Sequence, residues 1–560
     1  MQAYSYIGVK MIIKTLLVLL CFCQLAWAAP TPLMPIKDLQ AGMTGIGKTV
    51  IQGDKIEEFQ VEILGVSGSE TSGYSIFAKV SGDVIDRAGG VAQGMSGSPV
   101  YVDGRLVGAV AFGKLFNSPE YCFLMPIHNM LKLQDQADYS EELKLPKGTA
   151  LQAGSFTKEA LGCLQKQLEP YGLEVNGIGG SGGPMPTGAL EPGSAIGVSL
   201  LQGDLTLGAL GTVTWVDDQG HVLAFGHPFM SRGNSNFFMN KVWILGCIPN
   251  LQTSYKVGNL GKAIGTITQD RSSGIAGRVG SLPKYIPIYA TALDEERQLQ
   301  QSYRVEAIDD HKLLPAMVEA VFVNSITKAM DRSGGGTAKV HFLIRGADKE
   351  GKPLVIDREN MFYSAQSLQA GLDGELTTAL TVLTQNKFEA VNIHNITVES
   401  SLSTEVKVAE LTSVATKKRT VKAGEEIELK VTLRPHRGQE FDKIITFTVP
   451  KDRSKGPMAL SVRGGSSMAW VQQLLQKQKE EGLPAQQKEQ SLSLQDFVKE
   501  INEANKNNQL LVDITTPALG GHKEQELGFS AMLKGSPYKK KYDFDFIIDG
   551  EQEIVLQITD

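Results

Sequence analysis

The sequence predicts a mainly β protein with several domains, and three observations lead to this prediction. Polar and apolar side chains alternate over short runs such as 59–66 and 426–433, as in half-buried strands. Glycine is abundant, at 59 residues, while aromatic residues make up only 7% of the chain, which favours turns between short strands. At 560 residues the chain exceeds what one hydrophobic core can organise.

The first 28 residues have the pattern of a secretory signal peptide. Lys10 and Lys14 precede an apolar run from Leu16 to Leu25, and the segment 26–28 reads Ala-Trp-Ala, a small-x-small cleavage site. The run is shorter than the ~20 residues that a membrane-spanning helix needs. We therefore expect an exported protein of the periplasm, cell envelope or extracellular space.

Charge and cysteine content argue against several other classes of protein. The net charge is −6 with both signs interspersed, so no nucleic-acid partner is expected. Cys122, Cys163 and Cys247 follow the signal segment, and their spacing fits no zinc site. We expect them to be buried as small apolar residues, and we expect no metal and no cofactor.

Residues 31–135 read as a compact β domain that carries a glycine-rich turn. Apolar strands at 100–102 and 106–112 flank the turn Asp103-Gly104, a hairpin signal. Just before this hairpin, Ser96 lies between Gly94 and Gly97. Glycines allow a tight turn that exposes a serine nucleophile and leaves the N–H groups of Gly94 and Ser96 to form an oxyanion hole. The alternative is a β-turn with an inert serine.

The segment 93–99, Gln-Gly-Met-Ser-Gly-Ser-Pro, resembles the nucleophile segment of the SpoIVB peptidases, a family of serine proteases. It is also similar to the Gly-Asp-Ser-Gly-Gly-Pro segment of chymotrypsin-like proteases. The resemblance extends over about 89–130. It implies two chymotrypsin-like β-barrel halves, with Ser96 as the catalytic nucleophile.

A connecting segment at 136–190, with an amphipathic helix expected over 158–168, precedes a second barrel half at 191–385. There the strand 208–216 and the strand 221–229 form a pair that leads to Gly226-His227. This resembles the second SpoIVB hallmark and makes His227 the catalytic base by position. The alternative is a core histidine at a strand end. In the family the histidine precedes the serine, and here the order is reversed. Because triads are defined by geometry and not by chain order, a circularly permuted pair of barrels could bring the two segments together.

The acidic member of a triad is less determined. The resemblance points to Asp83, upstream of the serine, with Asp86 and Asp204 as rivals. A turn carboxylate that pairs with Arg87 is an equal alternative for Asp83. A site with only Ser96 and His227 is a further alternative.

Two glycine motifs imitate nucleotide-binding loops. Residues 42–49 have Walker A spacing, but a strand and not a helix is expected after them. Residues 177–182 match a dinucleotide fingerprint but run into Gly183-Pro184, which cannot open a helix. We therefore expect no nucleotide ligand.

The C-terminal third predicts a separate module. Regular alternation at 404–408, 426–433 and 444–450 predicts an immunoglobulin-like β-sandwich over 386–465. The remaining segment, 466–560, is expected to hold helices over 468–481 and 492–507, and C-terminal strands that pair back into the sandwich. Helices are also expected over 313–330 and 364–385.

These expectations combine into an exported serine endopeptidase of the SpoIVB type. It would cleave protein or peptide substrates through an acyl-enzyme, and the resemblance implies substrates at membranes. The alternative is a catalytically inactive envelope protein that binds a partner with a protease-like fold. The separation of Ser96 and His227 in space distinguishes the two.

Overall fold

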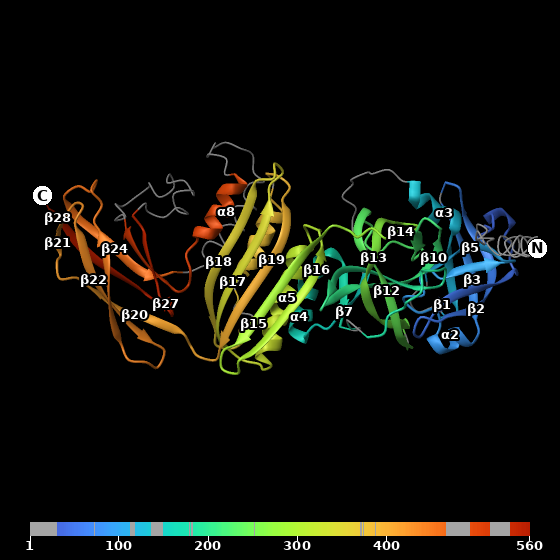
Figure 1. The fold of residues 1–560 in the computed structure, drawn as a ribbon, viewed down its shortest axis with the longest axis horizontal. Coiled ribbons are helices and arrows are strands. Elements are labelled where there is room, and N and C mark those ends of the chain that lie inside the picture. Colours follow the sequence, from blue (N-terminus) through green and yellow to red (C-terminus); the bar gives the residue numbers. More distant parts are fainter. Residues whose placement is uncertain are drawn as a thin grey trace, which may run out of the picture.

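The computed structural model describes residues 31–71, 73–112, 118–135, 149–177, 180, 183–250, 252–369, 372, 374–386, 388–465, 493–515 and 538–559. The molecule is elongated, with a small barrel at the N-terminal end, a large curved sheet in the middle and a sandwich at the C-terminal end (Figure 1). The predicted signal peptide and the predicted helix over 468–481 lie outside the described residues.

The N-terminal part is a closed barrel of six strands. Its order around the barrel is β1 (Thr44–Val50), β2 (Ile56–Ser69), β3 (Gly73–Ser81), β6 (Tyr121–Pro126), β5 (Arg105–Phe112) and β4 (Pro99–Val102). The alternating side chains of these strands fill it, including Ile63, Ile76 and Leu124. The segment 42–49 enters strand β1, as expected, and not the helix that a phosphate-binding loop requires.

Thirteen strands form the large sheet, and six of them close a second ring. The sheet order is β18-β17-β19-β15-β16-β9-β12-β13-β14-β11-β10-β7-β8, with an additional pairing of β9 with β10. That pairing joins the two ends of the run β9-β12-β13-β14-β11-β10. The ring comprises β9 (Ala195–Gly203), β10 (Thr206–Val216), β11 (His221–Ala224), β12 (Gly233–Ile248), β13 (Tyr255–Arg271) and β14 (Gly274–Val279).

The fold class is therefore the predicted one: mainly β, with two barrels of the chymotrypsin-like kind. One is closed by N-terminal strands and the other is built into the large sheet. The sheet continues through β15 (Tyr285–Asp294), β16 (Leu299–Ile308), β17 (Gly336–Ala347), β18 (Pro353–Ser364) and β19 (Asn392–Ser403), and ends at the other side in β7 (Thr149–Gly154) and β8 (Leu173–Asn176).

Three helices pack together against the extended part of this sheet. Helix α5 (Leu314–Met330) is buried along most of its length and contacts α4 (Lys158–Leu168), α6 (Glu375–Thr384), β15 and β16. The helices expected over 158–168 and 313–330 are thus present. The expected helix over 364–385 is shorter, because β18 extends to Ser364 and α6 begins at Glu375.

The C-terminal sandwich consists of a four-stranded and a five-stranded sheet. The first has the order β23 (Phe441–Thr448), β22 (Glu426–Pro435), β20 (Val408–Ala415), β27 (Ile547–Asp549); the second has β21 (Thr420–Lys422), β28 (Glu551–Thr559), β24 (Gly456–Gly464), β25 (Gln509–Thr515), β26 (Lys540–Asp543). The C-terminal strands pair back into the sandwich, as expected. Strand β19 belongs to the large sheet, so the sandwich begins with β20.

Candidate active site

The glycine-rich turn lies where the two rings of strands meet. It follows helix α2 (Asp83–Ala88) and leads into β4. Gly94 and Gly97 both have positive φ, +91° and +94°, a conformation that side chains with a Cβ rarely adopt. A Cβ on Gly97 would lie 1.9 Å from the Thr212 carbonyl oxygen and 2.5 Å from the Phe225 nitrogen. Only glycine therefore permits this approach of the two parts of the chain.

Local hydrogen bonds determine the direction of each peptide in the serine turn. The Met95 amide donates to Ala92 O at 2.9 Å, and the Ser98 amide donates to Met95 O at 2.9 Å. The Gly97 amide donates to Val110 O at 2.7 Å. Within the described part of the chain, the amides of Gly94 and Ser96 donate to no backbone acceptor. These are the two N–H groups that the sequence assigned to an oxyanion hole.

Strand β10 of the second ring holds the serine turn through its carbonyl groups. The Thr212 amide donates to Ser96 O at 2.8 Å, and the Thr212 hydroxyl donates to Gly94 O at 2.9 Å. The Thr214 hydroxyl donates to Gly97 O at 2.8 Å. Both threonines are fully buried. The turn is therefore positioned by a strand more than a hundred residues further along the chain.

The histidine turn meets the same strand. It follows β11, and both Phe225 and Gly226 have positive φ, +70° and +67°. The Phe225 amide donates to Thr212 O at 3.4 Å, so the two backbone groups of Thr212 contact the serine turn and the histidine turn. A Cβ on Gly226 would lie 3.2 Å from Val110 O of the first barrel. The two predicted catalytic segments are thus neighbours in space.

His227 follows Gly226 and is partly buried. Its Nδ1 lies 2.8 Å from Pro228 O, and because a carbonyl oxygen only accepts, Nδ1 carries the proton and Nε2 the lone pair. Burial lowers the pKa of the imidazole below its usual value, although the Pro228 carbonyl acts in the opposite direction. Because the pKa is lowered overall, the imidazole is neutral at pH 7. The contact with Pro228 O selects the tautomer that a general base needs.

A buried carboxylate shapes the chain just after His227. Asp270, at the end of β13, accepts the amides of Phe229 at 2.7 Å, Met230 at 2.8 Å and Arg232 at 3.1 Å. Burial raises its pKa, while these hydrogen bonds lower it. Asp270 and Thr212 could not be predicted as site residues from the sequence, because nothing local distinguishes one aspartate or threonine of a strand from another.

Asp83 is placed away from this site. Its side chain is 80% exposed on α2, and its carboxylate accepts from Arg87 Nε at 2.7 Å. The same guanidinium also contacts Glu57. This ion pair is the alternative that the sequence left open, and it corrects the assignment of Asp83 as the residue that orients His227. Of its two rivals, Asp86 is exposed on the same helix, and Asp204 lies in an exposed turn where it accepts the Arg304 amide at 2.7 Å.

His221 lies at the start of β11, and its Nδ1 lies 2.8 Å from Asp217. Cys122, Cys163 and Cys247 are free thiols; Cys122 is buried as expected, whereas Cys163 and Cys247 are only partly buried. In the ranges given above, no group of histidine, cysteine and carboxylate side chains could hold a metal ion. No helix there is both long and apolar enough to cross a membrane.

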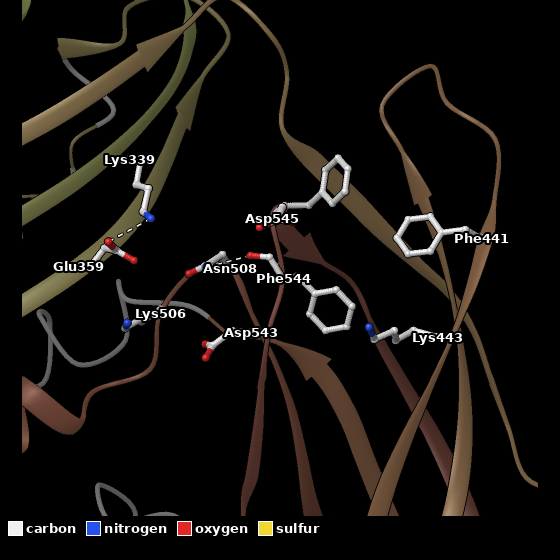
Figure 2. A pocket seen from close by; sticks show the side chains of 10 residues that line it. Lys339, Glu359, Phe441, Lys443, Lys506, Asn508, Asp543, Phe544 and Asp545 are labelled. Carbon is white, nitrogen blue, oxygen red and sulfur yellow. Dashed lines mark hydrogen bonds and ion pairs between the residues drawn. The ribbon is translucent and has the colours of Figure 1, made fainter. Parts of the chain in front are cut away.

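A cavity of about 410 Å³ lies far from this site, at the junction between the large sheet and the sandwich (Figure 2). Phe441 and Phe544 face it together with several charged side chains, and Lys339 forms an ion pair with Glu359 at 3.1 Å. Among the residues that the structure describes, its lining includes no serine, cysteine or histidine. These described residues therefore offer no hydroxyl or thiol nucleophile of the kind expected for Ser96, and no imidazole base.

Comparison with known proteins identifies the N-terminal part of the chain. Residues 26–131 match the family described as SpoIVB peptidase S55. This segment includes the whole first barrel and the serine turn. No curated protein and no solved structure matches the chain. Over this segment, which is less than a fifth of the 560 residues, the chain is similar to the SpoIVB peptidase family.

Proposed function

We propose that this protein is an exported serine endopeptidase that cleaves specific protein substrates. The family match supports a peptidase in general. The observation that carries the proposal further is the position of Thr212, whose amide contacts Ser96 O and whose carbonyl contacts the Phe225 amide. It joins the serine turn to the histidine turn despite the reversed order of the two segments.

In this proposal Ser96 Oγ attacks the carbonyl carbon of the scissile amide, and His227 Nε2 accepts the hydroxyl proton. The new C–O bond gives a tetrahedral oxyanion, which the amides of Gly94 and Ser96 stabilise. When the C–N bond breaks, the amine leaves with the proton from His227. Water then attacks the acyl-enzyme by the same route and regenerates Ser96.

The orienting partner of His227 in this mechanism is a backbone carbonyl and not a carboxylate. Pro228 O accepts the Nδ1 proton at 2.8 Å, which maintains the required tautomer. Asp270 supports this arrangement indirectly, because it binds the amides that follow Pro228. The proposed machinery is therefore a Ser96–His227 pair.

Labelling with a fluorophosphonate, which reacts with activated serines, tests the proposal. We expect the full chain to be labelled at one site and Ser96→Ala to be unlabelled. Ser98→Ala is the matched control, because Ser98 is two residues away but buried, with its hydroxyl donating to Met95 O at 2.6 Å. If the wild type remains unlabelled while correctly folded, the alternative of an inactive envelope binding protein replaces this proposal.

A further inference from the structure

A buried lysine lies directly behind the serine turn. Lys256, near the start of β13, has no exposed surface. A Cβ on Gly94 would lie 3.0 Å from Lys256 Cδ, so the lysine stem packs against this glycine. The Lys256 amide also donates to Gln93 O at 2.9 Å. Lysine is among the residues that proteins least often bury, so its presence here needs a reason.

The backbone contact of Lys256 determines where the Gly94 amide points. In a trans peptide, the C=O and the following N–H point in opposite directions. Because Gln93 O faces β13, the Gly94 N–H faces away from β13. This is one of the two amides proposed to form the oxyanion hole.

The side chain of Lys256 acts on the other peptide of Gly94. Its Nζ donates to Thr212 Oγ1 at 3.3 Å and to Thr49 Oγ1 at 2.9 Å. Thr212 Oγ1 in turn donates to Gly94 O at 2.9 Å. A chain of hydrogen bonds therefore leads from the ammonium group through Thr212 to Gly94. Among the described residues, Lys256 forms no ion pair with a carboxylate.

Filling space does not explain this arrangement, because methionine would occupy a similar volume without burying a charge. Burial lowers the pKa of Lys256 to about 7. The titratable neighbour of Lys256 is Cys247 on β12. Burial raises the pKa of this thiol, while Arg87 on α2 lowers it. The ammonium group contacts the hydroxyl of Thr49 on β1 and the hydroxyl of Thr212 on β10.

We propose that Lys256 is a positioning residue for the serine turn. Its backbone amide fixes the peptide before Gly94, and its ammonium group, acting through Thr212, fixes the peptide after Gly94. Together these contacts aim the Gly94 N–H at the oxyanion. This inference rests on the proposed peptidase function. The charge on Lys256 strengthens the chain of hydrogen bonds when the lysine is protonated. Reactivity of Ser96 should then decline as pH rises through about 7, while deprotonation of His227 produces a rise at lower pH.

The test measures the second-order rate constant for fluorophosphonate labelling from pH 5 to pH 9, together with the melting temperature. It compares wild type, Lys256→Met, Thr212→Val and Thr49→Val, with Ser96→Ala as background. Thr49→Val is the matched control: Thr49 and Thr212 are both fully buried acceptors of the same ammonium group, but the hydroxyl that donates to Gly94 O is that of Thr212.

We expect Lys256→Met and Thr212→Val each to slow labelling about tenfold, less than the loss of a direct oxyanion donor. Thr49→Val should stay within about twofold of wild type. In Lys256→Met the decline near pH 7 should disappear and the rise at lower pH should remain. The double variant Lys256→Met with Thr212→Val should be no slower than either single variant, because the two residues act in one chain.

Wild-type rates and an unchanged pH profile in folded Lys256→Met, with Ser96→Ala unlabelled, would overturn this inference alone. Equal labelling of wild type and Ser96→Ala would overturn the proposed function and this inference with it. Should Lys256→Met not fold, the comparison of Thr212→Val with Thr49→Val decides: equal rates contradict the positioning role, and a selective loss in Thr212→Val supports it.

Discussion

The Thr212 amide donates a hydrogen bond to Ser96 O at 2.8 Å across the junction of the two barrels. This single contact joins a residue of the second ring to the predicted nucleophile of the first. Because Thr212 O also accepts the Phe225 amide, one residue of β10 contacts both the serine turn and the histidine turn.

His227 is expected to be essential and His221 dispensable. His227→Gln should reduce fluorophosphonate labelling by about 10⁴-fold, as for loss of the base in a serine protease, without a change in melting temperature. His221→Gln is the matched control, because His221 is half-exposed and its Nδ1 contacts Asp217. Equal effects of the two substitutions would contradict the assignment of His227.

Gly97→Ala should disrupt the junction of the barrels. The new Cβ would overlap the Thr212 carbonyl and the Phe225 nitrogen, at a φ of +94°. We expect a loss of at least about 3 kcal/mol in the free energy of unfolding, measured by urea denaturation. Gly162→Ala is the control: this glycine lies in α4 with open space around it, and the change should stabilise the helix by up to ~1 kcal/mol.

Asp83→Asn should leave both labelling and stability nearly unchanged. The Asp83 carboxylate is 80% exposed in its ion pair with Arg87, and exposed pairs contribute only about 0–1 kcal/mol. The measurements are the labelling rate constant and the melting temperature. A loss of labelling beyond tenfold would restore Asp83 as a member of the catalytic site.

Asp270→Asn should weaken the turn after His227. Three backbone N–H groups now donate hydrogen bonds to the carboxylate. The NH₂ group of an asparagine would face at least one of these donors and could not accept its hydrogen bond. We expect a loss of about 1–3 kcal/mol in the free energy of unfolding and slower labelling. Asp204→Asn provides the comparison, since Asp204 accepts a backbone amide in an exposed turn; similar losses in both would argue against a special role for Asp270.

Stability should rise with pH between about 7 and 10 because of Lys256. Its pKa is lowered from 10.5 to about 7 in the folded protein, so in this interval the unfolded state binds more protons than the folded state. The free energy of unfolding therefore increases with pH in this interval. The contribution of Lys256 to stability is least favourable below pH 7, where the lysine is charged in both the folded and the unfolded state.

Lys256→Met should remove this pH dependence and raise stability below pH 7, as measured by urea denaturation at pH 6, 8 and 9.5. A wild-type curve that is flat across this interval, or that remains unchanged in Lys256→Met, would show that the folded protein does not lower the lysine pKa.

The strands and the serine turn could be predicted because they depend on neighbouring residues. Alternation of side chains predicted β2, β22 and β23, and glycines on both sides of Ser96 predicted a tight turn. The helix over 364–385 was predicted too long: β18 ends at Ser364, and α6 begins only at Glu375, after Gly374 with a φ of +64°. The pairing of β19 with β15 and β17, and not with the sandwich, is set by contacts distant in sequence.

By itself, the sequence determined a mainly β chain with a serine in a SpoIVB-like glycine turn and a histidine at the end of a strand pair. Only the tertiary structure decided that Thr212 joins these turns, that Pro228 O contacts His227, that Asp83 pairs with Arg87, and that Lys256 lies behind Gly94. The reason is physical. Turns and alternation depend on a few adjacent residues, whereas burial and hydrogen-bond partners depend on which distant strands close each barrel.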